Sequence, residues 1–128
     1  MTIYRVFGDD SGATHLVTVD LPGRDGGNDN VRRSLALRDI PVTTMNVTEL
    51  LERMPDGDLH TPPRRQLVVV LRGEMEIMTT SGDHRRIRAG DGLVADDLDT
   101  KGHITHDVGD DLLITLAVGI DSEWKWPG

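Results

Sequence analysis

The stretch QLVVVLRGEMEIMTT, residues 66–80, decides the fold class of this 128-residue chain. It contains two runs rich in β-branched and apolar residues, and Gly73 separates them at the place of a turn. This pattern predicts a strand, a turn and a second strand. Working outward, similar short runs occur at residues 1–7, 14–21, 42–48, 85–95, 103–108 and 112–120. Many short strands separated by turn signals predict an all-β sandwich or barrel.

Three stretches between these runs are either a loop or ambiguous. PGRDGGNDN, residues 22–30, combines Gly, Asp and Asn without an apolar residue, which is typical of a surface loop. Residues 31–41 carry no clear pattern, and ELLERM, residues 49–54, could form a helical turn or continue the preceding strand. Because 128 residues fit one compact domain and leave no room for two, we expect one domain over residues 1–128.

The composition narrows the classes of partner. The formal net charge is −8, from 22 acidic and 14 basic residues, so the summed field should repel nucleic acid and anionic membranes. Cysteine is absent, which excludes disulfides and thiolate metal sites. Neither an apolar leader nor a run of about 18 apolar residues that could span a bilayer is visible. We therefore expect a cytoplasmic protein that binds a small molecule.

The residues from Leu67 to Leu71 are apolar at every position. A strand with one face in water should alternate apolar and polar residues, so burial of both faces is expected here. The protein interior would cover one face, and either a second layer of this chain or a second copy would cover the other. We predict the second copy, and hence a homodimer.

Polar residues precede this apolar strand. In DLHTPPRRQLVVV, residues 58–70, strand alternation would place His60, Arg64 and Gln66 on one face, followed by valines. An imidazole, a guanidinium and a carboxamide at one end of an apolar wall are typical of a ligand pocket. Arg65 falls on the opposite face, where we expect it to serve the surface or a subunit contact.

These residues resemble the first motif of the cupin superfamily, G-x5-H-x-H-x3–4-E-x6-G. His60 stands at its first histidine, Gln66 at its glutamate and Gly73 at its last glycine. Gly90-Asp91 matches the turn that opens the second cupin motif, and His103 is the best match to the histidine of that motif. The resemblance implies a small single-domain cupin, whose fold is a jelly-roll barrel of the double-stranded β-helix type.

The resemblance covers about residues 57–118 and departs from the cupin pattern at its metal ligands. Pro62 replaces the second histidine of the first motif, and a neutral glutamine replaces the glutamate. The ligand set that the resemblance implies is therefore His60, Gln66 and His103, for a divalent ion such as Fe, Mn, Ni or Zn. Because these metals favour imidazole and anionic ligands, a site with and a site without metal both stay open.

Two acidic residues could complete a set of two histidines and one carboxylate. Asp58 shares strand parity with His60, and Asp107 shares it with His103. Lys101 also shares the parity of His103, but it lies among the acidic residues of the loop 96–101, which favours a solvated lysine.

Without a metal, the same residues offer acid–base chemistry. A histidine can give or take a proton near neutral pH, and Arg64 could bind a carboxylate or an enolate. We therefore assign catalysis to His60, Arg64 and His103 and expect an enzyme that acts on a small, anionic metabolite. By resemblance, it would be an isomerase, cyclase, lyase or oxygenase. The alternatives are a metabolite-binding or sensing module and an interaction protein with a degenerate pocket.

Overall fold

The computed structural model describes residues 1–19 and 39–125 of the chain. The loop predicted at 22–30 and most of the unassigned stretch 31–41 lie outside these residues. Within them the chain forms strands and no helix, and hence no helix that could cross a membrane. The strands are β1 (Ile3–Gly8), β2 (Thr14–Thr18), β3 (Val42–Glu49), β4 (Gln66–Arg72), β5 (Glu74–Thr79), β6 (His84–Arg88), β7 (Gly92–Asp96), β8 (His103–Val108) and β9 (Ile114–Ile120).

The strand positions confirm the all-β prediction. The stretch 66–80 forms β4 and β5, and Gly73 joins them with a φ of +80°. A Cβ atom at Gly73 would lie 3.0 Å from the backbone of Asp111 and Leu113, so this tight turn needs a glycine. ELLERM forms neither of its two predicted structures, because β3 ends at Glu49 and residues 50–54 belong to no helix or strand.

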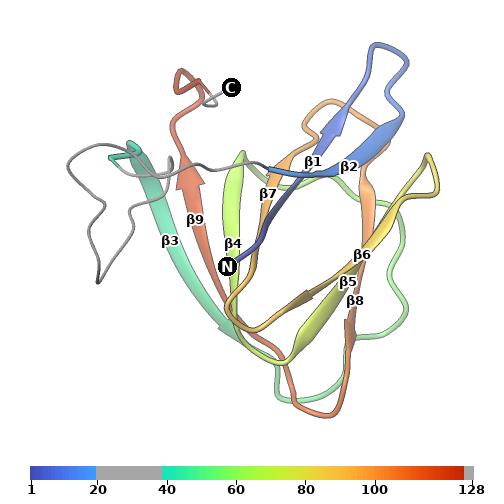
Figure 1. Cartoon of the computed structure of the whole chain (residues 1–128), viewed down its shortest axis with the longest axis vertical. Coiled ribbons are helices and arrows are strands. Elements are labelled where there is room, and N and C mark those ends of the chain that lie inside the picture. Colours follow the sequence, from blue (N-terminus) through green and yellow to red (C-terminus); the bar gives the residue numbers. More distant parts are fainter. Residues whose placement is uncertain (20–38, 126–128) are drawn as a thin grey trace.

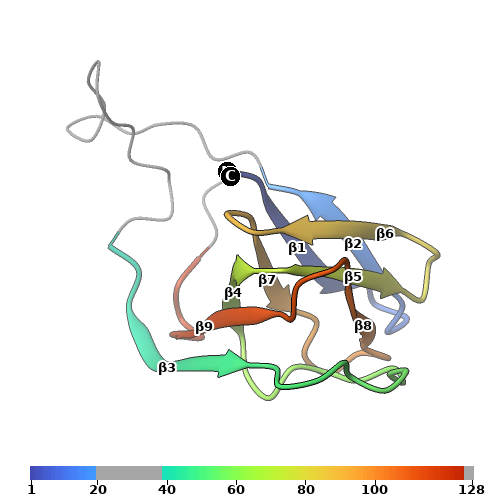
Figure 2. The ribbon, with the colours of Figure 1, turned by 90° about the horizontal axis from the view of Figure 1, so that it is seen from below.

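The described strands form two sheets and no closed barrel. The larger sheet has the order β2-β1-β7-β4-β9-β3, and the smaller one has the order β6-β5-β8. All pairs are antiparallel except β1 and β7, which run parallel. Figures 1 and 2 show the smaller sheet facing one side of the larger sheet, an arrangement consistent with a β-sandwich.

The hydrophobic core lies between the two sheets. Val6 and Val70 from the larger sheet and Ile77 and Ile87 from the smaller sheet are fully buried and belong to one cluster. Burial of such side chains supplies the main driving force for packing the sheets together.

The outer face of the larger sheet is apolar around β4. Leu67 and Val69 are half-buried there, and Leu71 is 51% exposed. On the edge strand β3, Met45 and Val47 are also exposed. Neither of the described sheets packs on this face, but Val94, which pairs with Leu67 on it, is fully buried. The apolar surface that stays exposed is therefore the part near Leu71 and β3.

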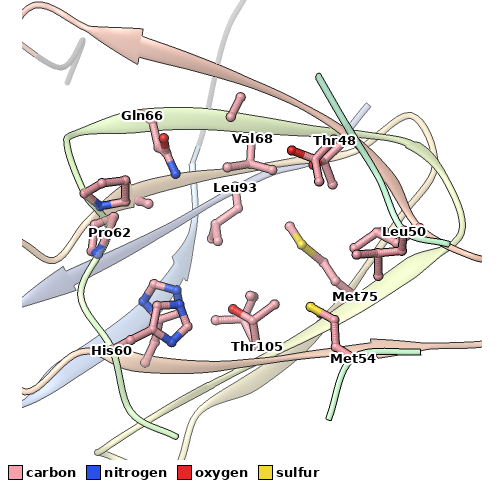
Figure 3. A pocket seen from close by; sticks show the side chains of 17 residues that line it. Thr48, Leu50, Met54, His60, Pro62, Gln66, Val68, Met75, Leu93 and Thr105 are labelled. Atoms are coloured by element: carbon pink, nitrogen blue, oxygen red, sulfur yellow. The ribbon is translucent and has the colours of Figure 1, made fainter. Parts of the chain in front are cut away.

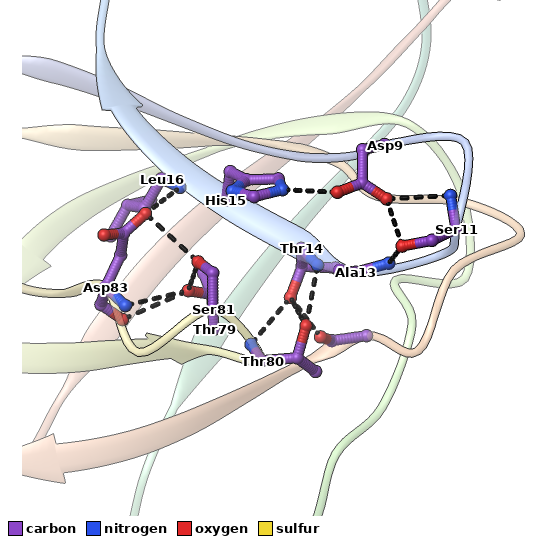
Figure 4. Close-up of polar contacts among 11 residues, drawn as sticks. Asp9, Ser11, Ala13, Thr14, His15, Leu16, Thr79, Thr80, Ser81 and Asp83 are labelled. Carbon is purple, nitrogen blue, oxygen red and sulfur yellow. Dashed lines mark hydrogen bonds and ion pairs between the residues drawn. The ribbon is translucent and has the colours of Figure 1, made fainter.

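A polar seam made by Thr14, Leu16, Thr80 and Asp83 joins β2 to the turn between β5 and β6 (Figure 4). The backbone N–H groups of Thr14 and Thr80 each donate to the other residue's hydroxyl oxygen, over 2.8 and 3.0 Å. The N–H of Leu16 donates to the Asp83 carboxylate over 3.1 Å. The fully buried Thr14 hydroxyl also donates to the Gly102 carbonyl over 2.8 Å, so the seam fixes the chain where it enters β8.

Candidate functional site

A cavity of about 280 Å³ opens between the two sheets (Figure 3). Its apolar lining includes Val68, Met75, Ile77, Leu93 and Leu113. Its polar lining consists of His60, Gln66, His103 and three threonines, Thr48, Thr105 and Thr115. An apolar cavity with a few polar groups is the usual form of a small-molecule site.

His60 and His103 lie side by side because the backbone joins them. Each donates its backbone N–H to the carbonyl of the other over 2.9 Å, which makes an isolated β-bridge between the loop before β4 and the start of β8. The ring centroids are 4.7 Å apart with a tilt of 54°. Gly102 makes this approach possible, since a Cβ atom there would overlap the backbone of His60.

Asp97 orients the His103 ring. Its Oδ2 lies 2.6 Å from Nδ1 of His103, and the two side chains are only 0% and 5% exposed. A carboxylate can only accept here, so the proton stays on Nδ1 and the Nε2 lone pair of neutral His103 remains available to a ligand. The other Asp97 oxygen, Oδ1, is buried without a hydrogen-bond partner among the described residues.

The His60 ring has a similar but weaker anchor. Its Nδ1 lies 3.2 Å from the carbonyl oxygen of Asp58, which is an acceptor, so Nε2 of neutral His60 is also the free nitrogen. Gln66 faces the same cavity from β4, on the wall across from His60 (Figure 3). The structure therefore brings together His60, Gln66 and His103, which the sequence singled out.

Arg64 does not join them. It is exposed and is not among the described residues that line the cavity. The parity that placed it beside His60 requires a continuous strand, but residues 61–65 are not a strand and β4 begins only at Gln66. The assignment of Arg65 to the surface is also wrong, because Arg65 is only 9% exposed and pairs with Asp96.

The other charged candidates also lie outside the cavity lining. Asp58 is exposed and contributes its carbonyl rather than its carboxylate, and Lys101 is exposed near Gly12. Asp107 accepts hydrogen bonds from Arg53 over 2.8 Å and from the backbone N–H of Met54 over 3.0 Å. It therefore supplies no carboxylate to the histidine pair.

The contact with Arg53 makes a pH-dependent contribution to stability. Burial acts to raise the pKa of Asp107, but the hydrogen bonds from Arg53 and Met54 outweigh it and lower this pKa below the ordinary value of an aspartate. Such a carboxylate stabilises the fold above its unfolded pKa, and this contribution disappears as the pH falls through the folded pKa.

Asp107→Asn should therefore lower the free energy of unfolding by at most about 1 kcal/mol at pH 7. In urea titrations, the difference from the parent should shrink as the pH is lowered from 4 to 2. Asp110→Asn, in the exposed turn that follows, is the matched control and should change little at any pH. If Asp107→Asn lowers the free energy of unfolding equally at pH 7 and pH 2, this assignment is contradicted.

Asp97 is the residue that the sequence did not reveal. It lies in the polar loop 96–101, where nothing in the pattern separates its carboxylate from those of Asp96 and Asp99. Its complete burial after the buried strand β7 depends on the tertiary packing and not on the local sequence.

Comparison of the chain with protein-family models, curated proteins and solved structures gave no match.

Proposed function

We propose that this chain is a small cupin-like enzyme that moves a proton on an organic molecule bound in the cavity between its sheets. The observation that carries the proposal is the buried contact between Asp97 and His103 at the wall of that cavity. The resemblance to the cupin motifs rests on His60, Gly73, Gly90-Asp91 and His103. An isomerisation, a cyclisation or an elimination would each fit such a site. The proposed location is the cytoplasm, as expected from the sequence.

The roles follow from the hydrogen bonds. His103 acts as the base through Nε2, because Asp97 holds the proton on Nδ1 and stabilises the positive charge that forms when the ring takes a proton. His60 is the more exposed ring, so it can exchange protons with water and serve as the acid. Gln66 offers an amide to the polar end of the ligand.

A metal ion would need His60, Gln66 and His103 as its ligands. These are two imidazoles and one neutral amide, and no group of three or more His, Asp or Glu side chains converges among the described residues. The set does not match two histidines and a carboxylate, so no step of the proposed reaction involves a metal. Metal-dependent oxygenase chemistry at these residues stays a prediction, which metal analysis of the protein purified without a histidine tag would check.

The base can be tested with 5-nitrobenzisoxazole, an uncharged compound. A base removes its C3 proton while its N–O bond breaks, and a coloured cyanophenolate is released. We expect the protein to accelerate this reaction, and His103→Gln to reduce the acceleration by about 100-fold or more. His84→Gln, on the exposed strand β6, is the matched control. An unchanged rate in a folded His103→Gln variant would rule out His103 as the base.

The alternative is a module that binds a metabolite in the same cavity without changing it. The buried Asp97–His103 contact favours the enzyme, because a binding site needs no oriented base. A ligand that binds but is recovered chemically unchanged, with none of its C–H protons exchanged, would favour the binding module.

We also propose that a second copy of the chain covers the outer face around β4 and β3. Leu71, Met45 and Val47 are exposed and uncharged there. Contact through an uncharged surface keeps the like charges of two copies, each with a net charge of −8, away from the interface. The mass of the protein in solution, measured by light scattering, would distinguish a dimer from the 14.1 kDa monomer.

A further inference from the structure

The cavity lining contains histidine but no other ionisable side chain among the described residues. Arg64 and Lys101, the two cations that the sequence placed near the histidines, do not line it. A carboxylate or phosphate that entered this cavity would lose its hydration without a lysine or arginine partner, which is costly. The positive charge that His103 could carry already has a partner in Asp97. The charge of a protonated His60 is exposed to water, which screens its attraction for an anion.

The cavity lining is divided into a polar part and an apolar part. His60, Gln66 and His103 supply the first, and Val68, Leu93 and their apolar neighbours supply the second (Figure 3). Such a site suits a ligand with one hydrogen-bonding group on an apolar body. The net charge of −8 adds a long-range field that disfavours the approach of anions.

We infer that the substrate is an uncharged, mostly apolar carbonyl compound with a C–H group next to its carbonyl. This inference rests on the proposed acid–base function and names the substrate class for the same site. It replaces the anionic metabolite expected from the sequence, because that expectation depended on Arg64.

The two imidazoles accept and supply every proton that the reaction moves. His103 Nε2 takes a proton from the carbon next to the carbonyl, and the electrons of that C–H bond form a C=C bond. The carbonyl π electrons move to the oxygen, which takes a proton from Nε2 of protonated His60. Return of the His103 proton to carbon and of the hydroxyl proton to His60 restores a carbonyl compound. Nothing is oxidised or reduced, and no further reactant is consumed.

Two probes that share one ring but differ in charge test the inference. They are methyl 4-oxocyclohexanecarboxylate, which is neutral, and 4-oxocyclohexanecarboxylate, which is an anion. Both are incubated with the whole chain in D₂O, and ¹H NMR follows the exchange of the protons next to the ketone. Saturation-transfer NMR measures binding of each probe in the same samples.

We expect the protein to exchange the neutral ester at least tenfold faster than the anion, after subtraction of the buffer rate. His103→Gln and His60→Gln should abolish this exchange, whereas His84→Gln on β6 should keep it. Because His60 is exposed, its variant keeps the test usable if His103→Gln fails to fold.

Other outcomes separate the inference from the proposed function. If the anion exchanges as fast as the ester and both depend on His103, the substrate class is wrong and the acid–base function holds. If the ester binds without exchange, the acid–base function is wrong and the ligand class holds. If the ester neither binds nor exchanges, the inferred substrate class is overturned.

Discussion

Asp97→Asn should reduce proton abstraction from 5-nitrobenzisoxazole by about 10²- to 10⁴-fold in a protein that still folds. An asparagine fills nearly the same volume, but its amide N–H can donate to Nδ1 of His103. The ring would then carry its proton on Nε2, where it blocks the lone pair that acts as the base. Initial rates between pH 5 and pH 9 measure the effect, and ¹⁵N NMR of the histidine rings reports the position of the proton.

The matched control is Asp99→Asn in the same loop. Asp99 is exposed, and its φ of +55° is a conformation that asparagine also accepts, so this variant should keep the parent rate and the parent ring state. A purely structural role for Asp97 would lower stability without moving the proton on His103. An Asp97→Asn variant with the parent rate and tautomer would contradict the assigned positioning role.

Gly102→Ala should lower the free energy of unfolding by about 2–4 kcal/mol and separate the two histidines. Gly102 has a φ of +83°, which an alanine adopts only with strain. In addition, the alanine Cβ would overlap the backbone of His60, so the bridge between His60 and His103 must open. Urea unfolding measures the stability, and the exchange rate of the neutral ketone measures the loss of the site.

Gly90→Ala separates the two causes of this loss. Gly90 has a φ of +91°, but a Cβ atom there would meet nothing within 4 Å. Its variant should therefore show only the conformational part of the cost, about 1–2 kcal/mol, and keep the activity. Equal losses of stability in the two variants would mean that the contact with His60 contributes nothing.

The all-β class and the positions of the strands were predictable because their signals are local. The alternation of short apolar runs and turns located the strands, and Gly73 located the turn between β4 and β5. The pairing of these strands was not predictable in the same way. The parallel contact between β1 and β7 joins residues about ninety positions apart, and no short sequence window records it.

The site was predictable only in part, for a related reason. His60, Gln66 and His103 were found because their spacing resembles a known motif, and the structure places all three at one cavity. Arg64 lies outside the cavity lining, because strand parity does not apply where the backbone leaves the strand. Asp97 was missed because the burial of one aspartate in an acidic loop depends on what packs over it.

The β-bridge between residues 60 and 103 also makes the site suitable for redesign. The two positions are joined by main-chain hydrogen bonds, so their separation does not depend on which side chains they carry. Pairs such as His–Asp, Glu–His or Cys–His could be introduced at these positions over the same apolar cavity. Because the backbone sets the geometry, a library of two positions would sample several kinds of reactive pair without a new scaffold.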